Sequence, residues 1–173
     1  MNLIEIHSLV NNKNFLDEKI DYYLKKSILK KQLKDEDEIK GHLEKAEHNL
    51  SFIKDNLEMG YLDWCVTGCY YAVYQASMSL IVSRGYSSKN HDATLCILIK
   101  EFYPKGITKE DVEMINKIFL DYQDLLFYVD SKSKREQASY SSGYKYDKKE
   151  VEELRLKTIN FVNKVKTILE NAS

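Results

Sequence analysis

The chain has 173 residues, of which 43% are apolar and 31% charged, a composition typical of one globular domain. A chain of this length buries enough apolar surface to fold without disulfides or metals. Its formal net charge of −1 excludes a protein whose overall field attracts nucleic acid or membranes, so such binding must come from a local patch. One proline and six glycines are few, which favours an all-helical protein.

Apolar residues recur with helical spacing along most of the chain and predict six helices. In chain order, the expected helices cover about 15–33, 35–60, 62–84, 91–103, 108–129 and 147–169. Short connections between amphipathic helices predict an all-α fold, an up-and-down antiparallel bundle of four to five core helices plus an N-terminal helix. We expect residues 1–38 to form a helical extension and residues 39–173 to form the bundle.

Several helix ends carry recognisable capping residues. Asp35 with Glu38, and Asp147 with Glu150, have the spacing of N-terminal caps, and Ser88 or Asn90 can cap the helix that begins at residue 91. Gly85 is expected to end the preceding helix in the left-handed conformation.

The helix expected over 62–84 is apolar nearly all round, which predicts a central position in the bundle. Its length approaches that of a membrane span, but Asp63, Thr67, Gln75 and its tyrosines indicate a core helix. Small residues form one line along this helix, and such a line allows another helix to approach closely or a partner protein to dock. The line consists of Cys65, Cys69, Ala72, Ala76 and Ser79.

The cysteines, at positions 65, 69 and 96, are odd in number and lack a CxxC spacing. This pattern argues against a disulfide framework or a zinc site, and we expect free, packed thiols. The sequence shows neither a metal-ligand cluster nor a glycine-rich phosphate loop, so no metal and no cofactor are expected. Free thiols and the lack of a recognisable signal peptide predict a cytoplasmic location and no membrane association.

Arg84 and His91 are candidates for chemistry because arginine is rare here, with three arginines among 26 basic residues. Cleavage of RNA without a metal needs a base, an acid and a cation for the developing phosphorane charge. A histidine can exchange the proton, and an arginine can hold the phosphate through two parallel hydrogen bonds. The structural alternative is that Arg84 caps the carbonyls of its helix and His91 bonds the loop backbone.

The connection from Ser131 to Tyr146 is the second candidate region, because a loop this long in a compact bundle is often functional. Four basic residues against one glutamate make it locally basic. Four of its side chains could stack on bases and hold phosphates. These are Arg135, Tyr140, Tyr144 and Lys145. The alternative is a solvated loop whose tyrosines fold back on the bundle.

Two segments together resemble the HEPN domain, a helical module of prokaryotic toxin–antitoxin and defence loci. The first runs from Tyr70-Tyr71-Ala72 through Arg84-Gly85 to His91, and the second is Arg135-Glu136-Gln137-Ala138-Ser139-Tyr140. The second is similar to the family pattern of arginine, two residues, alanine, an acid and tyrosine, with Ser139 in place of the acid. The resemblance covers about residues 40–170, including Trp64 and the last helix.

The resemblance implies a helical bundle that is commonly a homodimer. Many members are metal-independent ribonucleases that use an arginine and a histidine a few residues apart, and Arg84 and His91 enclose residues 85–90. Others bind nucleotides or pair with a small nucleotidyltransferase encoded beside them. We therefore expect either an endoribonuclease toxin component with Arg84 and His91 as its catalytic pair, or a non-catalytic nucleotide-binding or partner module. A third hypothesis is a structural adaptor that docks through the line of small residues.

Overall fold

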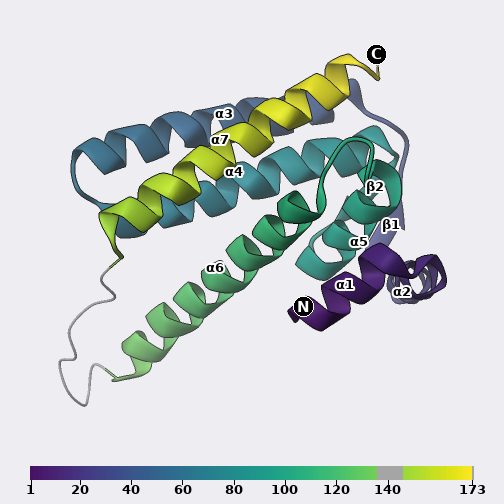
Figure 1. Cartoon of the computed structure of the whole chain (residues 1–173), viewed down its shortest axis with the longest axis horizontal. Coiled ribbons are helices and arrows are strands. Elements are labelled where there is room, and N and C mark those ends of the chain that lie inside the picture. Colours follow the sequence, from purple (N-terminus) through teal and green to yellow (C-terminus); the bar gives the residue numbers. More distant parts are fainter. Residues whose placement is uncertain (136–145, 173) are drawn as a thin grey trace.

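The computed structural model describes the backbone of residues 1–135 and 146–172 and the side chains of residues 1–122 and 146–172. It is a helical bundle with one short pair of strands, so the all-α prediction is confirmed (Figure 1). The elements are α1 (Leu3–Asn11), α2 (Lys13–Lys25), β1 (Leu29–Lys31), α3 (Glu36–Glu58), α4 (Leu62–Ser83), β2 (Tyr86–Ser88), α5 (His91–Phe102), α6 (Lys109–Arg135) and α7 (Lys148–Glu170).

Helix α4 is the centre of the bundle and packs against α3, α5, α6, α7 and β2. Figure 1 shows α3, α4 and α7 side by side. Gly68 lets α3 approach closely, because a Cβ at this position would lie 2.6 Å from Cγ1 of Ile53. No helix in the described part of the chain is long and apolar enough to cross a membrane.

The line of small residues on α4 is used within the chain. Cys65, Cys69 and Ala76 are completely buried, and so are the other members of the line. Burial raises the pKa of the Cys69 thiol to about 12, so this thiol stays protonated and acts as a packing group. The hypothesis that this line forms a surface for a partner protein is therefore wrong.

The capping predictions are confirmed. The Asp35 carboxylate accepts hydrogen bonds from the N–H groups of Asp37 and Glu38, and Asp147 does the same at the start of α7. Asn90 caps α5 by accepting the N–H of Ala93 at 2.9 Å. Gly85 has a φ of 74°, in the left-handed region that favours glycine.

The N-terminal region differs from the single helix expected over 15–33. Asn2 and Asn12 are the N-caps of α1 and α2. Helix α2 ends at Lys25, and the chain turns through Ser27 into β1, which pairs antiparallel with β2. Strands of three residues are too short to show an alternating pattern, so the sequence could not reveal them.

The ribbon of β1 and β2 changes the course of the chain between α4 and α5. Because β2 carries the chain back along α4, His91 at the start of α5 lies beside Tyr70 and Tyr74. The end of α5 reaches the end of α4, where Arg84 lies over the Phe102 ring. Helices α4 and α5 therefore run in the same direction, and this connection does not reverse the chain as it would in a simple up-and-down bundle.

Candidate functional site

His91 is held in an aromatic cluster at the first turn of α5. Its ring stacks on Phe119 of α6, with centroids 4.3 Å apart and planes 25° apart. Tyr70 and Tyr74 of α4 present their rings nearly at right angles to it, at 5.6 and 5.7 Å. Three helices thus fix the orientation of one half-buried imidazole.

The two ring nitrogens of His91 have different surroundings. Nε2 lies 3.2 Å from the Tyr70 hydroxyl, whereas Nδ1 is buried and has no hydrogen-bond partner among the residues that the structure describes. Burial lowers the pKa of His91 below its usual value of 6.5, and the nearby Asp92 carboxylate opposes this shift. The imidazole is therefore neutral at pH 7 and able to accept a proton. A buried nitrogen without a partner costs about 1–3 kcal/mol, so this is a locally unfavourable arrangement.

A tyrosine network extends from His91 along the α4–α6 interface. The Tyr70 ring stacks on Tyr122, and the Tyr71 and Tyr122 hydroxyls lie 3.0 Å apart. Burial raises the pKa of Tyr122 to about 12 and that of Tyr70 still further, so both phenols are neutral hydrogen-bonding groups at pH 7.

Arg84 occupies a different place. It is the C-cap residue of α4, and its exposed guanidinium lies over the Phe102 ring, with Cζ 5.0 Å from the ring centroid. This is the geometry of a cation–π contact, which leaves the guanidinium N–H groups available to a ligand.

The structure does not bring Arg84 and His91 together within one chain. His91 begins α5 and Phe102, the contact of Arg84, ends it. The rise of an α-helix places these ends roughly 16 Å apart. The two residues are near in sequence but separated because the strand β2 runs between them.

The remaining candidates can be located only in part. Arg135 is the last residue of α6, so residues 131–135 belong to a helix rather than to the expected loop, but its side chain is outside the described region. Tyr140, Tyr144 and Lys145 lie outside the described residues.

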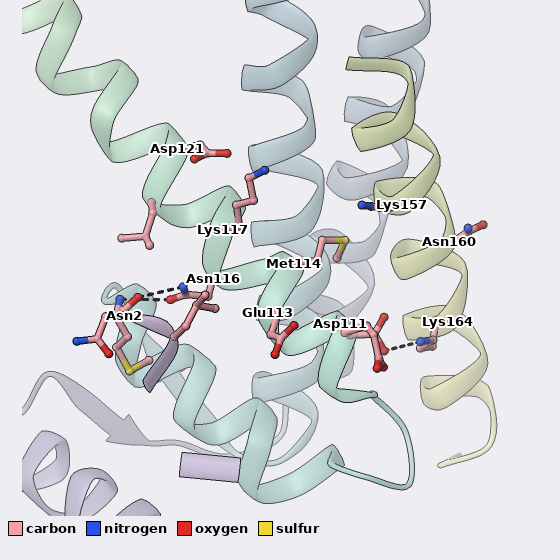
Figure 2. A pocket seen from close by; sticks show the side chains of 14 residues that line it. Asn2, Asp111, Glu113, Met114, Asn116, Lys117, Asp121, Lys157, Asn160 and Lys164 are labelled. Carbon is pink, nitrogen blue, oxygen red and sulfur yellow. Dashed lines mark hydrogen bonds and ion pairs between the residues drawn. The ribbon is translucent and has the colours of Figure 1, made fainter. Parts of the chain in front are cut away.

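A groove of about 900 Å³ lies between the start of α1, α6 and α7 (Figure 2). Three lysines and four carboxylates line it, and Lys164 donates a hydrogen bond to Asp111 across it. Because opposite charges offset one another here, the groove offers no concentrated charge to a ligand. Neither His91 nor Arg84 is among its lining residues, although the amino group of Met1, which lines the groove, lies 3.4 Å from the carboxylate of Asp92, the residue after His91.

Two features of the site were missed by the sequence reasoning. Phe119 and Tyr122 appeared only as part of the apolar stripe of α6, and nothing in that stripe identifies them as neighbours of His91. The second feature is the positive charge of the ribbon formed by β1 and β2, which the sequence does indicate. Residues 22–34 contain five lysines and no acidic residue.

Comparison with known proteins places the chain in a family. A model of the HEPN domain matches residues 39–168, about three quarters of the chain. A UPF0332 protein of Archaeoglobus fulgidus is 28% identical over 83 residues, which are 48% of this chain and 66% of that protein, just under two thirds of its length. The Methanocaldococcus jannaschii protein named "Putative toxin MJ0142" is 27% identical over 132 residues, which are 76% of this chain and 82% of that protein. The match to the HEPN domain covers most of the bundle, and the chain belongs to the HEPN family.

Proposed function

We propose that this HEPN protein is the toxin-like member of a two-gene pair and cleaves RNA without a metal, with His91 as its acid–base group. The observation that carries the proposal is the state of His91, a neutral imidazole whose buried Nδ1 lacks a partner within the described part of the chain. Proteins break local packing rules mainly where function requires it. The toxin-named relative, which matches 76% of this chain, supports the same interpretation.

The chemistry needs few groups. The neutral imidazole takes the proton of a ribose 2′-hydroxyl, and the 2′-oxygen then forms a bond to phosphorus while the bond from phosphorus to the 5′-oxygen breaks. A protonated group must return a proton to the leaving 5′-oxygen, and a cation must hold the phosphate. The Tyr70 hydroxyl at 3.2 Å orients the imidazole. Arg84 can serve as the cation only from a second copy of the chain or after a movement of residues 84–90.

A second candidate is a non-catalytic module that binds nucleotides or a partner nucleotidyltransferase. Two observations favour it. Arg84 lies at the far end of α5 from His91, and the nitrogens of His91 are enclosed by Tyr70 and by the protein interior. This candidate predicts equilibrium binding of ATP or of the partner without turnover of RNA.

The two candidates are separated by a cleavage assay on a generic single-stranded RNA in EDTA. We expect the wild type to cleave, His91→Gln to lose at least a hundredfold in rate, and His48→Gln, an exposed histidine on α3, to keep full activity. Thermal unfolding of all three proteins checks the fold. A wild type that never cleaves RNA but binds ATP in equilibrium dialysis contradicts the first candidate and supports the second.

A further inference from the structure

The ribbon formed by β1 and β2 carries a concentration of positive charge. Residues 22–34 hold five lysines and residues 84–91 hold Arg84 and Lys89, and neither segment contains an acidic residue. The whole chain has a net charge of −1. Hydrogen bonds join these two segments in space, so the charges of both lie around one ribbon.

The pairing of β1 with β2 determines how close the cations of the two segments lie to one another. Lys30 and Lys31 pair with Ser87 and Tyr86 of β2. The N–H of Gln32 donates to the carbonyl of Gly85 at 2.9 Å, which places Arg84 next to the same end of the ribbon. At the other end, Lys89 follows directly after β2, and α2 ends with further lysines close to β1.

Six of these cations make up what we call the basic ribbon. They are Lys25, Lys26, Lys30, Lys31, Arg84 and Lys89. All six are exposed, and none forms an ion pair with a carboxylate in the described part of the chain. Lys34 is left out because it pairs with Glu36 at 2.6 Å. The Glu38 carboxylate reaches the ribbon by accepting a hydrogen bond from Gln32 at 2.7 Å, but it forms no ion pair with any of the six cations. Clustered like charges repel one another, and a bound polyanion lowers that repulsion.

We propose that the basic ribbon binds the phosphate backbone of single-stranded RNA, an inference that rests on the proposed action on RNA and gives it a binding surface. Tyr22 is 52% exposed and lies one helical turn before Lys25 and Lys26. Tyr86, half-buried, stands opposite Lys31 in the ladder. Cations that follow a backbone, combined with aromatic rings on which bases stack, are the usual means of binding single strands. Arg84 thus belongs to the phosphate-binding surface.

The test measures binding of a fluorescent oligouridylate whose 2′-hydroxyls are methylated, so that it cannot be cleaved. We expect Lys30→Glu/Lys31→Glu to weaken binding more than tenfold and to lower the slope of log K against log salt by about 1.4, since each phosphate contact on a single strand contributes about 0.7. The matched control is Lys45→Glu/Lys54→Glu on α3, which makes the same change in net charge at two exposed lysines and should change binding less than twofold.

A second variant tests the proposal without changing a residue of the β1–β2 pairing, in case the double variant disrupts that pairing. Arg84→Gln lies outside the ladder and should weaken binding severalfold, with an unchanged melting temperature as the check on folding. The proposal is overturned if both double variants weaken binding equally, if neither does, or if the wild type binds no RNA. It is also overturned if the wild type binds only phosphatidylserine vesicles, because Leu33, 90% exposed beside the ribbon, would then mark a lipid contact.

Failure of the basic ribbon and failure of the proposed activity give different results. If the wild type binds RNA through the ribbon but never cleaves an unmethylated strand, the ribbon stands and the ribonuclease activity does not. If the wild type cleaves RNA and the Lys30→Glu/Lys31→Glu variant has an unchanged KM, the activity stands and the ribbon does not.

Discussion

His91 shows how far single residues can be interpreted from sequence. Its position at a helix start could be predicted, because the cap at Asn90 is local in the chain. Its chemical state could not, because it depends on Tyr70 and Phe119, residues from other helices. The same distinction holds elsewhere. The cap at Asp35 was predictable, whereas the hydrogen bond that joins the half-buried His42 to Gln75 of α4 was not.

The lowered pKa of His91 makes the stability of the protein depend on pH. The unfolded chain protonates this histidine near pH 6.5, while the folded chain resists protonation because the ring is buried. The unfolded state therefore binds more protons at lower pH, and folding stability should fall as the pH drops through 6.5 towards the folded pKa. His91→Phe keeps the stacking on Phe119 but cannot titrate.

We expect the melting temperature of the wild type to fall between pH 7.5 and 5.5 more than that of His91→Phe, as measured by circular dichroism. His48→Phe serves as the control, because His48 is exposed and its loss should leave the pH dependence of the wild type. Equal pH dependence in the wild type and His91→Phe would show that the buried ring does not resist protonation.

At the scale of elements, most helices were predictable, whereas α1 and the ribbon were not. The spacing of apolar residues specified α3 and α4 closely, because each buries one or more complete faces over many turns. The strands β1 and β2 have three residues each, and their pairing joins positions far apart in the chain. The ribbon also decides the direction of α5, so an element that the sequence did not predict sets the distance between Arg84 and His91.

Gly85 holds this ribbon in place, and its replacement should show this. An alanine there would adopt a φ of 74°, and its Cβ would lie 2.9 Å from the carbonyl oxygen of Gln32. The left-handed conformation alone costs an alanine about 1–2 kcal/mol. We expect Gly85→Ala to lower the free energy of unfolding in urea by at least this amount and to weaken RNA binding by the basic ribbon.

Gly41→Ala provides a control of opposite sign. Gly41 lies inside α3, and a Cβ at this position would have no neighbouring atom within 4 Å, so alanine improves helix propensity without a clash. The free energy of unfolding should rise by about 0.5–1 kcal/mol. A Gly85→Ala protein as stable as the wild type would show that the ribbon does not need the left-handed turn.

At the scale of the whole molecule, Arg84 and His91 are far apart within one chain. Whether one chain or two chains supply the residues of a cleavage site can therefore be tested directly. One chain presents a neutral imidazole at one end of α5 and, at the other, a guanidinium that forms no ion pair with the residues that the structure describes. In a two-fold dimer, when one residue of the first chain contacts a second residue of the partner, the same contact forms with the two chains exchanged. Two chains can therefore bring Arg84 of one copy to His91 of the other, although one chain cannot.

Mixing two inactive variants distinguishes a shared site from a site within one chain. We expect Arg84→Ala and His91→Gln each to be inactive, and their equimolar mixture, after exchange of subunits, to recover about a quarter of the wild-type rate. Half of the dimers are then mixed, and each mixed dimer has one intact site of the two. Activity should also fall on dilution below the dimer dissociation constant.

A mixture that stays inactive while light scattering shows mixed dimers contradicts a shared site. Full activity of Arg84→Ala at saturating RNA would instead limit this arginine to the binding of RNA at the basic ribbon, with His91 acting beside another cation.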